Sequence, residues 1–295
     1  MTKFYIIGAS GLIGSALFSL LKSKNLNVVG TYSNNKEEAL IYFDMNKGDY
    51  KCFDNVNEGD IFYLLSAYSN PSWIAQNKTQ AEELNYTSTI KLIDFLMKKK
   101  AKIVFMSSVE IFDGTKGNYS EKDYPNPLNF YGKLKLSIEK YLLNNSNNYT
   151  IVRTGWNVGL NEKSRCVVQL TYETLLKPNA KMATDNFFSL SSIEDTAEGL
   201  YRSSLQNNLR KIHICSSEII SRLEMATILK NESKKGIDMD FSECHFKDIP
   251  YSEPRGRIND LDNFLSRDLL GMQYSNAYEL IRKKVAYLDK TFITG

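Results

Sequence analysis

Short apolar runs alternate with segments of helical periodicity through the first part of the chain. The runs predict strands at 4–7, 28–32, 61–65 and 102–106, and apolar spacings of three and four predict helices from residue 12 and over about 81–97. Continuous apolar runs are typical of strands that are buried on both faces. Because strands that alternate with helices form parallel βαβ units, the pattern predicts an α/β protein with a parallel sheet.

The pattern becomes less regular after residue 107. Residues 113–129 contain glycines, prolines and asparagines and predict a surface loop, after which a helix at 130–143 and a strand at 150–153 restore the alternation. The remaining elements are a strand at 211–215 and helices at 164–176, 192–205, 221–231 and 275–288. We predict a core at 1–155 and a smaller, mostly helical part at 156–295, interleaved so that a strand and a helix near 180–215 return to the sheet.

Composition excludes several classes of protein. The 295 residues include 37 basic and 34 acidic side chains, and the resulting charge of +3 is too small to suggest nucleic-acid binding. A hydrophobic share of 42% argues against disorder. The longest apolar runs, such as Ile61–Leu65, are far shorter than the roughly 18 residues of a membrane-spanning helix. Because the chain opens without a cleavable apolar stretch, we predict a cytoplasmic protein that binds neither membranes nor nucleic acids.

Cysteine and histidine usage argues against a metal site. The cysteines form no CxxC pair, and the adjacent Cys244 and His245 are poorly spaced for two ligands on one regular element. We therefore predict that the thiols are reduced and that no metal is bound. The cysteines and histidines of the sequence are Cys52, Cys166, Cys215, Cys244, His213 and His245.

Three glycines stand between the first predicted strand and the first predicted helix. Gly8-x-x-Gly11-x-x-Gly14 has the spacing that permits a tight turn and the close approach of a pyrophosphate to the backbone. The helix that begins near Leu12 and Ile13 would direct unpaired N–H groups at the phosphates, and Ser10 could add a hydroxyl donor. The motif predicts nucleotide binding, with a ligand-free tight turn as the alternative.

The end of the second strand indicates which dinucleotide is bound. A carboxylate there would bind the adenosine ribose, whereas small polar or basic residues accommodate a 2′-phosphate. The chain has no acid there until Glu37, so we predict NADP rather than NAD, although Lys36 could simply be a solvated lysine. The other predicted cofactor contacts in this region are Tyr32, Ser33, Asn34, Met45 and Asp44, the last as a partner for the adenine amino group.

A tyrosine and a lysine lie one helical turn apart after the surface loop. Tyr131-x-x-x-Lys135 places both side chains on one helix face, where an ammonium would favour ionisation of a phenol whose pKa is ordinarily near 10. Ser108, just past the fourth predicted strand, could hold a substrate oxygen in the same cleft. The set predicts proton transfer to or from a carbonyl or alcohol, while an isolated Tyr-x-x-x-Lys often arises by chance.

These motifs together resemble the extended short-chain dehydrogenases/reductases, and most closely the dTDP-4-dehydrorhamnose reductase branch. The resemblance covers nearly the whole chain and is strongest over residues 4–156. The matching segments are Gly8–Gly14, Ser107-Ser108-Val109-Glu110-Ile111-Phe112-Asp113-Gly114, Asn126-Pro127-Leu128-Asn129-Phe130-Tyr131-Gly132-Lys133, Lys135 and Ile151-Val152-Arg153-Thr154-Gly155-Trp156.

The resemblance implies a Rossmann-type doubly wound sheet that binds the dinucleotide in 1–155, with a substrate-binding part in 156–295. It gives Ser108 the place of the catalytic hydroxyl, Tyr131 that of the proton donor and Lys135 that of the lysine on the nicotinamide ribose. It also implies that Leu65-Ser66-Ala67 forms a turn covering the cofactor, and it matches Asn85 to a helix asparagine that could equally be a plain polar residue.

Some residues depart from the family's pattern and concern the substrate. Val109-Glu110 replaces the family's Asp-Tyr, so we expect Glu110 to contact the substrate and favour a deoxysugar other than the standard rhamnose precursor. Trp156 could stack on a sugar or base, or simply pack in the core. Arg255, with Arg257 close by, could hold a diphosphate, or both could be solvated.

The resemblance implies a reductase of a nucleotide-activated 4-keto-6-deoxysugar. The alternatives are an epimerase or dehydratase of the same fold and a non-catalytic NADP-binding protein like the regulatory subunit of methionine adenosyltransferase. A nucleotide sugar is the predicted partner molecule, and a homodimer is compatible with the resemblance.

Overall fold

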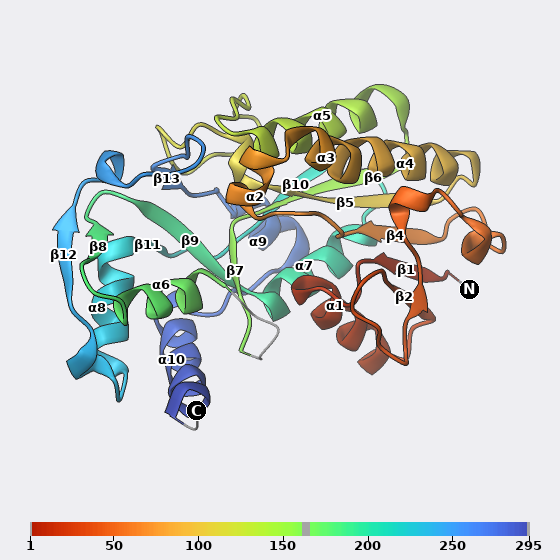
Figure 1. Ribbon diagram of the computed structural model, residues 1–295. Coiled ribbons are helices and arrows are strands. Elements are labelled where there is room, and N and C mark those ends of the chain that lie inside the picture. Colours follow the sequence, from red (N-terminus) through yellow and green to blue (C-terminus); the bar gives the residue numbers. More distant parts are fainter. Residues whose placement is uncertain (1, 161–165, 294–295) are drawn as a thin grey trace.

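The computed structural model describes residues 2–160 and 166–293, and its centre is a seven-stranded sheet (Figure 1). The strand order is β10-β6-β5-β4-β1-β2-β3, and every neighbouring pair is parallel. The strands are β1 Phe4–Ile7, β2 Val28–Tyr32, β3 Ile41–Tyr42, β4 Ile61–Leu64, β5 Lys102–Ser108, β6 Tyr149–Thr154 and β10 Lys211–Ile214. The predicted parallel sheet is confirmed.

Helices cover both faces of this sheet, which explains why the strands are apolar at consecutive positions (Figure 1). In β1, Phe4 and Ile6 pack into the cluster beneath α1 (Leu12–Ser23) and α7 (Ile193–Ser204). Tyr5 and Ile7 pack into the opposite cluster, beneath α4 (Ser88–Lys98) and α5 (Phe130–Asn145). The Rossmann-type doubly wound fold is therefore confirmed.

Shorter elements connect these layers. The segment between β4 and α4 forms α2 (Pro71–Gln76), α3 (Lys78–Glu82) and a π-helix, η3 (Glu83–Thr87). The 3-10 helices are η1 Met45–Lys47, η2 Lys51–Phe53, η4 Val109–Ile111, η5 Gly236–Asp238 and η6 Phe246–Asp248.

The C-terminal lobe contains the helices α6 Val167–Leu175, α8 Arg222–Glu232, α9 Phe264–Leu270 and α10 Ala277–Ile293. It has its own hydrophobic core between α6, α8, α10 and two small sheets, whereas α9 packs on β10 and α7. One sheet consists of β7 Trp156–Val158, β9 Phe187–Ser192, β11 Ile219–Ser221 and β13 Ile258–Asn259, and the other of β8 Ala180–Ala183 and β12 Phe241–Cys244.

These six short strands were not predicted from the sequence. They pair with distant segments, as when β9 pairs with β7, β11 and β13, so no local periodicity identifies them. The four helices predicted after residue 155 are present as α6, α7, α8 and α10 with shifted ends, although residues 164–165 of the first lie outside the described residues; α9 was not predicted.

The predicted boundary between the two parts, at residue 155, falls between β6 and β7. Some segments after this boundary nevertheless pack with the first part. β10 pairs with β6 in the main sheet and α7 packs against α1, whereas β8 and β9 pair within the C-terminal lobe. Within the described parts of the chain, no helix is both long and apolar enough to span a membrane.

Candidate active site

The turn after β1 is held by contacts that only glycine permits. Gly8 has φ of +90°, and a Cβ at Gly14 would lie 2.1 Å from the carbonyl oxygen of Gly8. A Cβ at Gly11 would meet only that same oxygen, at 3.2 Å, and Gly11 is exposed to solvent. The turn, which includes Ser10, thus leaves its backbone accessible at Gly11.

The ends of three strands meet at this turn. Thr31 of β2 accepts hydrogen bonds at its hydroxyl from the N–H of Gly8 and at its carbonyl from the N–H of Ala9, at 3.1 and 2.9 Å. The backbone of Ser66, just past β4, lies 3.1 Å from the position of a Cβ on Gly8. The glycine turn and Leu65-Ser66-Ala67 are therefore side by side, as the predicted cofactor contacts require.

The start of α1 suits an anionic ligand. Gly11 is its N-cap and supplies no side-chain acceptor, and its first turn, which begins with Leu12 and Ile13, has no acidic residue. The N–H groups there keep their capacity to bind phosphate oxygens. Together with the accessible backbone at Gly11, these features fit the pyrophosphate of a dinucleotide.

The predicted adenosine contacts lie at the ends of β2 and β3. Tyr32 ends β2 and is half-buried, while Ser33, Asn34 and Lys36 are exposed. Asp44 caps η1, which begins at Met45, by accepting two hydrogen bonds from Asn46 at Oδ1. One Asp44 oxygen is thus already used for local structure.

Tyr131, Lys135 and the end of β5 are brought together. Lys135 is 4% exposed, and its Nζ donates to the carbonyl oxygen of Met106 at 2.8 Å and lies 5.6 Å from the Tyr131 ring centroid. Met106 lies two residues before Ser108, whose Oγ accepts from the N–H of Glu110 at 3.2 Å. The half-buried Tyr131 thus lies beside the strand end that carries Ser108.

Burial changes the ionisation of both groups on α5. It raises the pKa of Tyr131, and the negative charge of Glu110 raises it further. Burial lowers the pKa of Lys135 to about 8, against the opposing effect of Glu139. In the free protein Tyr131 therefore holds its proton more tightly than an ordinary phenol, contrary to the expectation that Lys135 favours its ionisation.

Glu110 is tied to the N-terminus of α5. Its Oε2 accepts from Nδ2 of Asn129 at 2.6 Å, and Oδ1 of Asn129 accepts from the N–H of Gly132 at 2.8 Å as the helix N-cap. Among the hydrogen bonds of the described residues, the other carboxylate oxygen, Oε1, is unused. Glu110 thus touches the element that carries Tyr131 and keeps one oxygen for a ligand.

Asn85 holds the segment that follows the β4 turn. It is 4% exposed within the π-helix η3, and its amide bonds both the N–H and the carbonyl of Tyr68 at 2.8 Å. The Tyr68 ring, 44% exposed, stacks on Trp73 with centroids 5.0 Å apart. Asn85 is therefore a structural clamp rather than a plain polar helix residue.

Two arginines in the C-terminal lobe lie near each other without an acidic partner. Arg255 lies over the Tyr251 ring at 5.1 Å, and Arg222 lies 5.1 Å from the Phe188 ring and donates to the Thr171 hydroxyl at 3.0 Å. Burial lowers the pKa of Arg222, and the positive charge of Arg255 contributes in the same direction. Neither guanidinium forms an ion pair with a carboxylate in the described parts of the chain.

Sequence reasoning missed Arg222, because its position at the start of α8 resembles any solvated helix residue. The segment that carries Arg255 packs on the loop after η4, since a Cβ at Gly114 would lie 2.3 Å from Cα of Gly256. Trp156 packs on Phe188 with centroids 5.9 Å apart, and its buried indole N–H has no partner among the described residues.

A comparison with protein-family models matches residues 2–285 to the RmlD substrate binding domain. The chain belongs to this family. The resemblance inferred from its motifs is thereby confirmed.

A curated relative matches about half of this RmlD-family protein. The methionine adenosyltransferase 2 subunit beta of Bos taurus is 30% identical over 154 residues, which are 51% of this chain and 46% of the relative. The chain thus spans about half the length of that curated relative.

Solved structures share the fold over the whole chain. A dTDP-4-dehydrorhamnose reductase from Clostridium acetobutylicum has a TM-score of 0.81 at 23% identity, covering 97% of this chain and 99% of its own. MoeE5 in complex with UDP-glucose and NAD has a TM-score of 0.79 at 17% identity, covering 98% and 99%.

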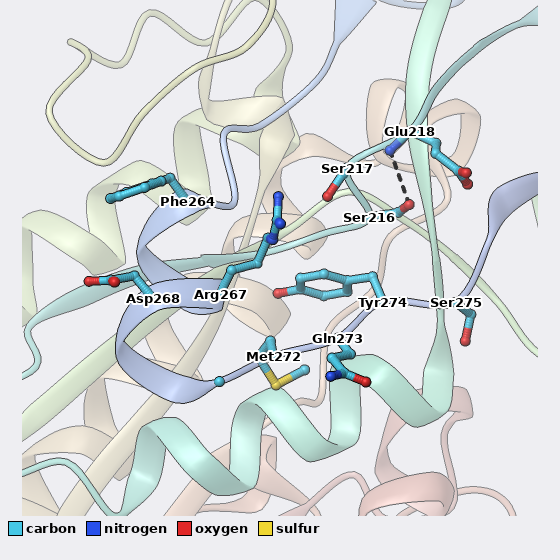
Figure 2. Close-up of a pocket in the computed structure, with 11 residues that line it drawn as sticks. Ser216, Ser217, Glu218, Phe264, Arg267, Asp268, Met272, Gln273, Tyr274 and Ser275 are labelled. Carbon is cyan, nitrogen blue, oxygen red and sulfur yellow. Dashed lines mark hydrogen bonds between the residues drawn. The ribbon is translucent and has the colours of Figure 1, made fainter.

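A separate cavity of about 910 Å³ lies between the segment after β10, α9 and the segment after α9 (Figure 2). Its lining includes Ser216, Glu218, Phe264, Arg267 and Tyr274, and none of the residues predicted for cofactor or substrate.

In the described part of this family member, no group of three or more His, Cys, Asp or Glu side chains could hold a metal ion.

Proposed function

We propose that the protein is an NAD(P)H-dependent reductase of a nucleotide-activated 4-keto-6-deoxysugar. The observation that carries the proposal is the buried Lys135 between Tyr131 and the end of β5, next to a glycine turn with an accessible backbone. In this proposal the proton donor acts at the carboxyl edge of a doubly wound sheet, where such folds bind their ligands.

The reaction adds a hydride to the carbonyl carbon and a proton to the carbonyl oxygen, which gives a secondary alcohol. A reduced nicotinamide supplies the hydride when it is bound. Ser108 orients the carbonyl oxygen with a hydrogen bond, and Tyr131 donates its phenolic proton to that oxygen. Lys135 stabilises the resulting phenolate until solvent returns the proton.

The residues that would hold the cofactor are those of the glycine turn, the end of β2, η1 and the β4 turn. NADP is the proposed form, because the exposed Ser33, Asn34 and Lys36 place no carboxylate at the end of β2. A titration of the intact protein with NADPH and NADH tests this choice. Tighter binding of NADH would contradict it.

The sugar nucleotide would lie between the two lobes. Arg222 and Arg255 are proposed to bind its diphosphate, since two neighbouring guanidiniums without a carboxylate partner favour an anion between them. Oε1 of Glu110 would accept from a sugar hydroxyl or acetamido group, and Trp156 would border the sugar. Glu110 is the reason to expect a deoxysugar other than the standard rhamnose precursor.

The test is NADPH oxidation with a panel of nucleotide-linked 4-keto sugars, with the Tyr131→Phe variant as the matched control. Oxidation by the parent and not by the variant supports the proposal. If no keto sugar is reduced although NADPH binds, the reductase function is wrong.

A second candidate is a regulatory protein, favoured by the similarity to a methionine adenosyltransferase subunit over about half of this chain. Against it, Ser108, Tyr131 and Lys135 are all present, and a binding role does not require them. The epimerase or dehydratase alternative has less support, because Val109 supplies no second acid or base. Product analysis would detect epimerisation or loss of water in place of NADPH consumption.

A further inference from the structure

A segment between η6 and β13 reaches from the C-terminal lobe to the helix that carries Tyr131. We call this segment, residues 250–256, the strap. Both of its flanks are anchored in the C-terminal lobe, because the N–H of Phe246 in η6 donates to Oδ1 of Asp185 at 2.7 Å and β13 pairs with β9. The Tyr251 ring also packs on Phe246, with centroids 5.1 Å apart.

The middle of the strap contacts three helices outside that lobe. The Ser252 hydroxyl donates to the hydroxyl of Ser72 on α2 at 3.4 Å. Oε1 of Glu253 lies 3.8 Å from Nζ of Lys78 on α3, and its Oε2 accepts from the N–H of Phe130 at 3.2 Å. The Lys78 ammonium also lies 5.9 Å from the centroid of the Phe130 ring. Since the Glu253 side chain is only 11% exposed, these contacts are largely shielded from solvent.

Phe130 is the first residue of α5, and Tyr131 is the second. The first N–H groups of a helix have no acceptor within the helix and carry a partial positive charge, so a carboxylate there is stabilising. Asn129, the N-cap, accepts from the N–H of Gly132, and the first turn of α5 contains no acidic residue. The carboxylate at this helix start comes from Glu253, 123 positions further along the chain.

We propose that Glu253 is a positioning residue for the proton donor: by holding the first N–H of α5, it ties the start of the helix to the strap. The inference rests on the proposed function, in which Tyr131 donates a proton and Arg255 binds the diphosphate. Arg255 is two residues beyond Glu253 on the same strap. The group that holds the nucleotide end of the substrate and the group that holds the proton donor's helix therefore share one short segment.

The Glu253→Ala variant removes the acceptor from the start of α5. We expect kcat for sugar reduction to fall about tenfold or more, since a small displacement of a catalytic group is costly. KM and the Kd for NADPH should change little. Glu253→Gln keeps an oxygen acceptor and should recover most of kcat, which a simple loss of negative charge would not.

Hydrogen exchange measures the helix start without turnover. In mass spectrometry of the intact protein after labelling, the peptide covering residues 128–136 should exchange faster in Glu253→Ala and like the parent in Glu253→Gln. If Glu253→Ala fails to fold, Glu253→Asp is the second variant, because its shorter side chain withdraws the acceptor from Phe130 and should raise the exchange rate in the same way.

Glu83→Ala is the matched control. It removes an acidic side chain from η3, where Glu83 is 52% exposed and pairs with Lys91 at 3.4 Å. Both kcat and the exchange of the α5 peptide should stay at the values of the parent.

Parent-like kcat and exchange in Glu253→Ala, or equal losses in Glu83→Ala, would overturn the inference. So would exchange restored by Glu253→Gln without recovery of kcat. A change in KM alone would identify Glu253 as a substrate contact and not a positioning residue. Absence of any sugar reduction by the parent is a failure of the proposed function, and the exchange measurement still decides whether Glu253 holds the start of α5.

Discussion

Arg153 on β6 and Glu139 on α5 form a two-pronged ion pair inside the protein. Nε and Nη2 of Arg153 lie 3.0 and 2.7 Å from the two Glu139 carboxylate oxygens, and the side chains are 1% and 5% exposed. Glu139 is one helical turn beyond Lys135. The pair therefore joins the helix of the candidate active site to the sheet beneath it.

Removing one partner of this pair should destabilise the fold. Glu139→Gln leaves the Arg153 charge buried without its counter-ion, which should cost about 3–5 kcal/mol in the free energy of unfolding. Chemical denaturation measures the loss. Glu58→Gln, which breaks an exposed pair with Lys100, is the control and should change little.

Two glycines of the first turn should respond differently to substitution. In Gly11→Leu the Cβ meets only the Gly8 carbonyl oxygen, at 3.2 Å, so we expect a folded protein that no longer binds NADPH, because the side chain blocks the pyrophosphate. Gly14→Leu would collide with the backbone of Gly8 and should lower the melting temperature as well. Cofactor fluorescence titration and thermal melting check both variants, and undiminished NADPH binding by folded Gly11→Leu would contradict the assigned cofactor site.

Tyr131→Phe should bind cofactor nearly as well as the parent and turn over about two to four orders of magnitude more slowly, the usual scale for a general acid. Single-turnover NADPH oxidation measures the effect. Equal rates in parent and variant would remove Tyr131 from the mechanism.

Lys135 should give a pH-dependent contribution to stability. Its pKa of about 8 in the folded protein is below the ordinary 10.5, so the unfolded chain binds more protons between these values. This contribution to stability therefore rises as the pH increases from about 8 to 10.5. The unfolding free energy of the parent, relative to that of Lys135→Met, should therefore rise over this range. A relative stability that does not change with pH would show that the pKa of Lys135 is not lowered in the folded protein.

Arg222→Ala should raise KM for the sugar nucleotide about tenfold or more, since a charge-assisted contact to phosphate is lost. The cofactor Kd should stay unchanged. Arg257→Ala is the control, because that side chain is exposed and, among the described residues, makes a single 3.5 Å contact to a backbone carbonyl. Equal KM values in parent and Arg222→Ala would exclude this arginine from the substrate site.

The parts of the structure that follow from local sequence were predictable. The apolar run at 4–7 and the glycines after it predict β1 and the turn before α1, and the spacing of four between Tyr131 and Lys135 places them on one helix face. Glu110 and Asn129, in contrast, are 19 positions apart, and no periodicity reports their hydrogen bond. The proximity of Arg222 and Arg255 depends on how α8 and the segment after η6 fold together, so only the structure shows it.

The position of β10 beside β6 has a consequence for synthesis of the protein. Residues 211–214 pair with 151–154, so a growing chain cannot complete its sheet until almost three quarters of it has left the ribosome. Before then, the backbone of β6 presents an unpaired edge that a second nascent chain could occupy. Fragments that end near residue 155 should therefore aggregate, and a separately supplied segment containing β10 should compete with that aggregation.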